Sequence, residues 1–246
     1  MTFNSFTFGL FLIIVFGGSR LPISWTVRKW MLLLASYVFY AAWNPIFVLL
    51  LWLSTGIDWW AAGLIARSSS MRRRDMLLGI SLISNLGLLA YFKYGTFLLV
   101  NVLDVSRHTG LEIDASIPNI VLPVGISFYT FQTLSYTLDV YRGVQKPAQS
   151  MLDFALYVTF FPQLVAGPIV RADEFLPQCE IQHRSGPLEI SWGMILLLLG
   201  LFEKVVVADG LLSPVVEAIY GNVHSPPSLL GSWSGAIAFA GQIFCD

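Results

Sequence analysis

The sequence predicts an all-α fold, a polytopic membrane helical bundle in which some segments are broken or re-entrant. Of the 246 residues, 56% are hydrophobic and only 12% are charged, whereas soluble domains carry about 25% charged residues. So few polar side chains cannot cover the surface of a water-soluble globule. Apolar runs recur along the whole chain, and prolines interrupt some of them, which favours a bundle that includes broken helices.

The first apolar run, residues 1–18, predicts an uncleaved membrane span. No Lys or Arg precedes it and no A-x-A site follows it, although a cleaved signal peptide needs both. The first positive charges come after the run, at Arg20, Arg28 and Lys29. Because basic loops stay on the cytoplasmic side, we expect the N-terminus to face outward.

Residues 30–65 predict two helices joined by a turn at Asn44-Pro45. Proline lacks a backbone N–H and disfavours helix in the residue before it. The first of the two runs is short for a bilayer core about 30 Å thick, so we expect that helix to tilt or to extend into its preceding flank. The next loop is also predicted to be cytoplasmic, because it carries a cluster of positive charges at Arg67, Arg72, Arg73 and Arg74.

Later apolar segments predict further helices at 76–100, 119–141, 151–170, 188–208 and 229–246. A polar connector is expected at 171–187. The long stem of Lys93 allows its ammonium group to reach the headgroups from within an apolar run. Gly231 and Gly235 are four residues apart, which predicts a close helix contact. Together the runs give about six or seven membrane segments.

A polar face is predicted on the helix that includes residues 122–143. On a helix, Gln132, Ser135, Tyr136 and Asp139 share one side. A polar face inside a membrane must meet protein or a water-filled cavity. Two interpretations remain open: a hydrogen-bonded seam between helices, or the lining of a cavity with Gln132 and Tyr136 as candidates.

Residues 160–171, FFPQLVAGPIVR, predict a broken segment because two prolines and a glycine oppose a regular spanning helix. The freed backbone groups need partners, so this segment should be buried in protein or line a cavity. Gln163 can both donate and accept hydrogen bonds there, and Arg171 can bind a carboxylate or phosphate through two hydrogen bonds. The alternative is a broken helix with an interfacial arginine.

Other polar residues give little sign of a catalytic centre. His108, His183 and His224 lie in polar connecting segments, and none sits in an apolar run beside a carboxylate, as a general base would. No metal-ligand spacing, nucleotide loop or nucleophile elbow occurs. No basic stripe with interleaved aromatics points to nucleic acid. Cys179 and Cys245 are isolated and predict neither a disulfide nor a zinc site.

Glu203, Lys204 and Asp209 gather near one end of the run at 188–208. Adjacent residues on a helix point to different faces, so Glu203 and Lys204 need not pair with each other. We favour an interfacial anchor over a functional site.

Five segments in order resemble the membrane-bound O-acyltransferase family, and most closely its bacterial alginate O-acetyltransferase-like branch: 36–54, 85–99, 122–143, 153–178 and 200–209. Glu203 is a departure, because the family more often has a basic residue before Lys204. The resemblance covers essentially the whole chain. It implies a partial version of an all-helical bundle with a central tunnel and re-entrant segments, and it supports a tunnel-lining role for Gln132, Tyr136, Gln163 and Arg171.

The resemblance also implies an activity and its partners. Family members transfer an acyl group, commonly acetyl, to hydroxyls of an extracytoplasmic acceptor such as alginate. We therefore expect a multi-pass protein of the bacterial inner membrane that contacts lipid. Its acyl donor would be acetyl-CoA or an acetylated carrier, with no bound cofactor. Its partners would be a polysaccharide or periplasmic acetylation proteins.

Chains of this family run to about twice this length and carry the proposed catalytic histidine in a later tryptophan–arginine–histidine motif. The resemblance thus implies that the catalytic histidine lies beyond Asp246, the last residue of the sequence. We therefore expect residues 1–246 to be the N-terminal portion of one transmembrane domain, inactive alone and completed by a second polypeptide. The alternative is a non-catalytic membrane subunit or a remnant of a truncated gene. A transporter is a weaker alternative, because no inverted repeat is evident.

Overall fold

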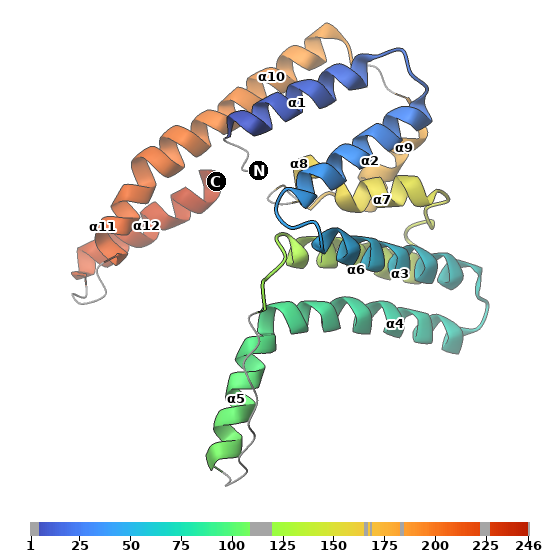
Figure 1. Cartoon of the computed structure of the whole chain (residues 1–246), viewed down its shortest axis with the longest axis horizontal. Coiled ribbons are helices and arrows are strands. Elements are labelled where there is room, and N and C mark those ends of the chain that lie inside the picture. Colours follow the sequence, from blue (N-terminus) through green and yellow to red (C-terminus); the bar gives the residue numbers. More distant parts are fainter. Residues whose placement is uncertain are drawn as a thin grey trace. The chain divides into compact units, whose positions relative to one another are not determined.

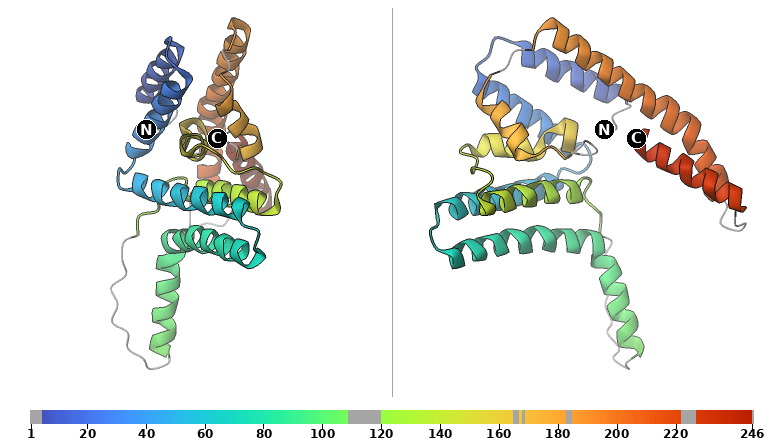
Figure 2. Two further views of the ribbon diagram at one scale, coloured as in Figure 1. Left: turned by 90° about the vertical axis from the view of Figure 1, so that its right-hand side faces the viewer. Right: turned by 180° about the vertical axis from the view of Figure 1, so that it is seen from behind.

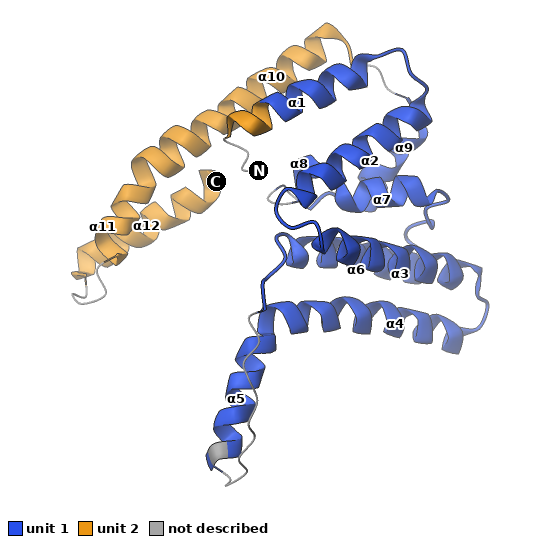
Figure 3. Ribbon diagram, viewed as in Figure 1, with its two compact units in different colours: residues 1, 10–182 blue, residues 2–9, 183–246 orange. Residues whose placement is uncertain are grey.

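The computed structural model describes residues 5–108, 120–164, 167, 169–182, 185–221 and 227–245. Every regular element in these ranges is a helix (Figure 1). The chain divides into two compact units (Figure 3), one comprising residues 1 and 10–182 and the other residues 2–9 and 183–246. The prediction of an all-α fold is confirmed.

The larger unit contains most of the first helix and the eight α-helices that follow it. A π-helical turn, η1, joins two of them into one continuous helix that bends there (Figure 1). The elements are α1 (Phe6–Arg20), α2 (Trp25–Ala41), α3 (Phe47–Arg67), α4 (Met71–Leu89), η1 (Ala90–Tyr94), α5 (Gly95–His108), α6 (Ile126–Arg142), α7 (Met151–Thr159), α8 (Phe161–Leu164) and α9 (Ala172–Glu180).

The predicted turn at Asn44-Pro45 is confirmed, since it lies between the end of α2 and the start of α3. The helix before it also extends into its flank, as its short apolar run led us to expect. It begins at Trp25, where the Ser24 hydroxyl caps the first turn by accepting a hydrogen bond from the Val27 N–H at 3.4 Å. This extension places Lys29 on the helix itself.

Two helices of the described residues are long and apolar enough to cross a membrane. They are α3 and the continuous helix Met71–Ser106, while α1 and α12 (Leu229–Cys245) are apolar but shorter. The long span predicted at 76–100 is confirmed and extends at both ends. The larger total of about six or seven membrane segments stays a prediction.

The centre of the larger unit is the packing of α3 against α4, α6 and α7. Figure 1 and Figure 2 show α4 and α6 running alongside α3. Large apolar and aromatic side chains fill the space between these helices, including Leu51, Ile65, Tyr129, Tyr136, Phe154 and Tyr157, all at most 1% exposed. The rings of Tyr136 and Phe154 lie 4.6 Å apart between centroids.

The break predicted in residues 160–171 is confirmed in the described part of that range, because α7 ends at Thr159 and the short α8 follows Phe160, whereas residues 165, 166 and 168 lie outside the described residues. The predicted polar connector at 171–187 is only partly right, because α9 occupies much of it. Ala172, Leu176 and Cys179 recur at helical spacing and are buried. Most of the residues between them are polar, so the composition of this segment did not indicate an amphipathic helix.

The smaller unit contains α10 (Pro187–Phe202), the π-helical η2 (Glu203–Leu212), α11 (Ser213–Tyr220) and α12. The close contact predicted for Gly235 is confirmed, since a Cβ at this position would lie 2.7 Å from the Tyr220 ring. Lys204 forms an ion pair with Asp209 at 3.0 Å, and both side chains are partly exposed.

The helix predicted at 188–208 is longer than expected. The elements α10, η2 and α11 follow one another without a gap, so the helical chain runs from Pro187 to Tyr220.

The last helix of the smaller unit matches the one predicted at 229–246 as far as the structure describes it. The helix α12 begins at Leu229 and ends at Cys245. Asp246, where the prediction ended, lies outside the described residues. The expectation that a catalytic histidine lies beyond Asp246 therefore stays a prediction.

Candidate functional site

A polar seam surrounds the break between α7 and α8. In a regular helix the Tyr157 carbonyl would accept a hydrogen bond from the Phe161 N–H, four residues later. Here the Phe161 N–H donates to the Ser36 hydroxyl at 3.2 Å. The Tyr157 carbonyl instead accepts from Gln132 Nε2 at 3.0 Å and from Gln163 Nε2 at 2.7 Å.

The structure therefore brings Gln132 and Gln163 together, although they are 31 positions apart in the sequence. Both side chains are buried, at 0% and 5% exposure. Their amide donors contact backbone, which is the arrangement of a hydrogen-bonded seam between helices. Their lining of a tunnel stays a prediction.

The other two candidate residues lie elsewhere in the larger unit. The buried Tyr136 hydroxyl accepts a hydrogen bond from the Ala148 N–H at 2.9 Å, which ties α6 to the loop before α7. Arg171 is exposed at the N-cap of α9. The exposure of Arg171 agrees with the interpretation as an interfacial arginine better than with a position in the buried seam.

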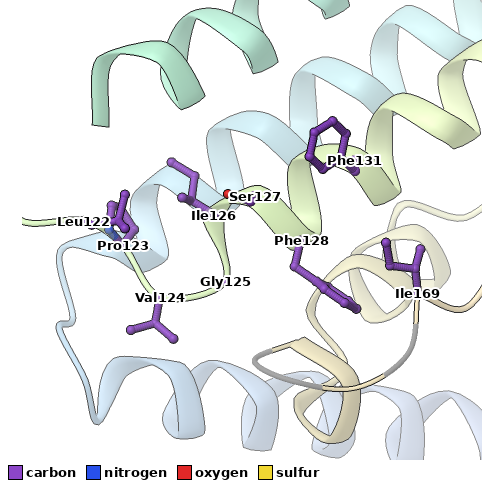
Figure 4. Close-up of a pocket in the computed structure, with 9 residues that line it drawn as sticks. All are labelled: Leu122, Pro123, Val124, Gly125, Ile126, Ser127, Phe128, Phe131 and Ile169. Carbon is purple, nitrogen blue, oxygen red and sulfur yellow. The ribbon is translucent and has the colours of Figure 1, made fainter. Parts of the chain in front are cut away.

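A pocket of about 400 Å³ lies where α6 begins (Figure 4). Gly125 starts the helix from a left-handed backbone conformation, with φ of 74°, which glycine adopts without steric cost. Ile169 contributes to the wall from the segment after α8, so two of the five resemblance segments meet here. The lining is Leu122 to Phe128, Phe131 and Ile169, nearly all apolar.

Sequence reasoning missed this pocket because it searched for polar residues in apolar runs. The signal that could have found it is the pair Pro123 and Gly125, which ends the preceding irregular segment and opens α6. None of the four candidate lining residues contributes to the pocket wall. The pocket and the seam are neighbouring features of α6, to which the consecutive residues Phe131 and Gln132 respectively contribute.

A largely buried ion pair lies where α2, α7 and α9 meet. Lys29 Nζ lies 2.5 Å from Asp153 Oδ1 and donates to the Cys179 carbonyl at 3.3 Å. Trp25 Nε1 donates to the same carbonyl at 2.6 Å. Burial raises the pKa of the Cys179 thiol to about 11. The two hydrogen bonds to the Cys179 carbonyl attach α9 to α2. The helix α9 is not one of the two helices long enough to cross a membrane.

A second polar cluster, centred on Asp58, escaped sequence reasoning entirely. Asp58 on α3 is 0% exposed, and Ser81 and Asn85 on α4 donate to its carboxyl group. The residues on each helix are spaced by three or four positions, which places them on one face. This spacing could have indicated a polar face on each helix from the sequence alone. The residues concerned are Ser54 and Asp58, Ser81 and Asn85, and Thr130, Thr133 and Thr137.

The histidines do not form a catalytic constellation in the part of the chain that the structure describes. His108 is exposed at the end of α5, where its Nδ1 lies 2.7 Å from the Asp104 carbonyl. His183 and His224 lie outside the described residues. Across the described ranges, no three His, Cys, Asp or Glu side chains gather to hold a metal ion.

Comparison with known proteins identifies relatives over the whole chain. The "Probable alginate O-acetylase AlgI" of Pseudomonas aeruginosa is 33% identical over 253 residues, covering 100% of this chain and 46% of the relative. The protein of the same name from Pseudomonas putida is 33% identical over 251 residues, covering 100% of this chain and 50% of the relative. The whole chain is therefore similar to about half of proteins that are named as alginate O-acetylases.

A further relative is named for a different polymer. The "Peptidoglycan O-acetyltransferase" of Helicobacter pylori is 31% identical over 247 residues, covering 89% of this chain and 45% of the relative. The chain thus spans about half the length of the curated relatives it matches. No family model matches it. No solved structure matches it.

Proposed function

We propose that the chain is part of a membrane O-acetyltransferase that transfers acetyl groups to hydroxyls of an extracytoplasmic polysaccharide such as alginate. The observation that carries this proposal is the whole-chain similarity to proteins named for O-acetylation of alginate and of peptidoglycan. Both polymers are built from sugars with free hydroxyls. The proposed setting is the bacterial inner membrane, crossed several times.

The pocket at the start of α6 is the proposed binding site for the acyl group. Its walls are apolar, with Phe128 and Phe131 among them, and apolar walls with a few polar groups are typical of small-molecule sites. Acetyl-CoA or an acetylated carrier would present its thioester there. The seam at Tyr157 supports this role by fixing α6 against the broken segment.

In the proposed reaction, an acceptor hydroxyl oxygen attacks the thioester carbonyl carbon. A general base removes the hydroxyl proton, a new C–O bond forms, and the C–S bond breaks with release of the thiol. Gln132 and Gln163 cannot serve as that base, because an amide side chain does not accept a proton at neutral pH. Its proposed source is a histidine beyond Asp246, in the portion of the relatives that this chain does not span.

A complementation experiment tests the proposal. The chain would be expressed in membranes alone, and together with the portion of the Pseudomonas aeruginosa relative that it does not match. Acetyl transfer from labelled acetyl-CoA to alginate oligosaccharides would then be measured. Because the portion from the relative lacks the pocket residues, we expect transfer only when both polypeptides are present.

Two outcomes would contradict parts of the proposal. Transfer by the chain alone would show that the catalytic base lies within it. If the pair shows no transfer although both polypeptides copurify, the chain is instead a non-catalytic membrane subunit. A matched variant, Ile169→Trp, should reduce transfer by filling the pocket, whereas Ile181→Trp on the exposed surface beyond α9 should not.

A further inference from the structure

Asp58 lies at the centre of a hydrogen-bond network between α3 and α4. Its carboxyl group is 0% exposed. The Ser81 hydroxyl donates to Oδ1 at 2.5 Å. Asn85 Nδ2 lies 2.9 Å from Oδ1 and 2.9 Å from Oδ2, and it also donates to the Ser81 carbonyl at 3.0 Å. Ser81 and Asn85 are one helical turn apart, so α4 presents both donors to one carboxyl group.

The helix α6 closes the network on another side. Thr133 Oγ1 lies 3.4 Å from Asn85 Oδ1 and 3.2 Å from the Thr130 carbonyl. The Thr137 hydroxyl, one turn further along α6, faces the Asp58 carboxyl group. Thr137 Oγ1 is buried without a hydrogen-bond partner among the described residues, and so are the hydroxyls of Ser54 and Thr55, one turn before Asp58 on α3.

The charge of this network is unbalanced if Asp58 is ionised. Within the described ranges, no Lys, Arg or His side chain forms an ion pair with it. Among the titratable side chains on the elements packed against α3, Tyr136 of α6 interacts electrostatically with Asp58, and a phenol supplies no positive charge. A buried carboxylate without a cation is strongly unfavourable, whereas a neutral carboxylic acid is far less so.

We propose that Asp58 carries a proton in the folded chain and forms a proton-dependent latch between α3, α4 and α6. One carboxyl oxygen accepts hydrogen bonds from Ser81 and Asn85. The protonated oxygen donates to the Thr137 hydroxyl, which has lone pairs free to accept. Loss of the proton would leave a negative charge against neutral groups and would loosen α3 from the other two helices.

The geometry favours a proton over a bound metal cation. Sodium would also suit a set of carboxyl, amide and hydroxyl oxygens. The Asn85 amide, however, directs its N–H side at both carboxyl oxygens, and a coordinated cation would be bound through the amide oxygen instead. The latch is independent of the pocket at α6 and of the proposed acetyl transfer.

The test compares four forms of the full chain, purified in detergent: wild type, Asp58→Asn, Asp58→Ala, and Glu174→Gln as a control. Glu174 is an exposed carboxylate on α9. Infrared spectra at neutral pH should show the carbonyl stretch of a protonated carboxyl group in the wild type. The band should persist in Glu174→Gln and be absent from both Asp58 variants.

Thermal unfolding supplies the second measurement. Asp58→Asn is neutral at every pH, so its Tm should match that of the wild type at mildly acidic pH and should not fall as the wild type does on alkalinisation. Asp58→Ala leaves Ser81 and Asn85 without an acceptor, and its Tm should fall by about 5 °C or more. Three results would overturn the proposal: a missing carboxyl band in the wild type, equal losses for both Asp58 variants, or stabilisation of the wild type by sodium that Asp58→Asn abolishes.

Discussion

Gln132 and Gln163 donate hydrogen bonds to one carbonyl oxygen, that of Tyr157, from two different helices. A carbonyl oxygen has two lone pairs, so two donors satisfy it completely. The break between α7 and α8 is therefore stabilised by two side-chain amides in place of the helical hydrogen bond that it loses. This explains how the chain can break its helix next to the buried Phe161 and Gln163 without leaving the Tyr157 carbonyl unpaired.

We predict that the two amides depend on each other. Gln132→Leu or Gln163→Leu alone should lower the free energy of unfolding by about 1 kcal/mol, since the carbonyl keeps one donor. The double variant should lose about 1–3 kcal/mol more than the sum of the single losses, because the buried carbonyl is then unpaired. Detergent or denaturant unfolding of the four forms measures this coupling.

The control for this prediction is Gln178→Leu. The Gln178 amide donates to the Glu174 carbonyl at 2.8 Å, but its side chain is exposed. Water can replace that bond, so the stability should change little. Strictly additive losses at Gln132 and Gln163 would show that the shared carbonyl does not couple them.

The second prediction concerns the ion pair between Lys29 and Asp153, whose side chains are 11% and 15% exposed. Lys29→Met or Asp153→Leu alone should cost about 3 kcal/mol, because each leaves an unpaired charge in a largely buried position. The double variant should cost less than the two single losses combined. Unfolding measurements at low and high salt would check both points.

A matched pair in the smaller unit provides the comparison. Lys204 and Asp209 are also paired, but their side chains are 31% and 41% exposed. Removing either should cost less than about 1 kcal/mol. Equal losses at the two pairs would contradict the importance that we attribute to burial at Lys29.

Local chemistry made the chain breaks predictable from sequence, whereas long-range pairing did not. Pro45 and Pro162 remove backbone donors, so the turn after α2 and the break after α7 follow from the residues themselves. The Asp58 network joins residues 23 to 48 positions apart, and helical spacing marks the polar face of each helix without identifying which faces meet. The exposure of Arg171 likewise depends on how α9 packs, and α9 was hidden by its polar composition.

The third prediction is that Cys179 reacts slowly with thiol reagents. A raised pKa means less thiolate at a given pH, and at pH 8 a thiol with a pKa of about 11 is ionised in about one molecule per thousand. Alkylation should accelerate about tenfold per pH unit until it approaches that pKa. Mass spectrometry of the chain in detergent would give the rate. Labelling at the rate of a free exposed thiol would contradict the burial of Cys179.

The last prediction uses the two glycines with left-handed backbones, Gly125 at φ 74° and Gly143 at φ 76°. Alanine at either position is strained by about 1–2 kcal/mol. A Cβ at Gly143 meets no atom within 4 Å, so Gly143→Ala should lower stability through backbone strain alone and leave acetyl transfer intact in the complemented protein. Gly125→Ala should lower stability similarly but also impair transfer, because Gly125 forms part of the pocket wall.

Measuring Tm and acetyl transfer for both glycine variants separates the effect on stability from the effect on the pocket. Equal transfer by the two variants at equal stability would argue that the pocket does not hold the acyl group.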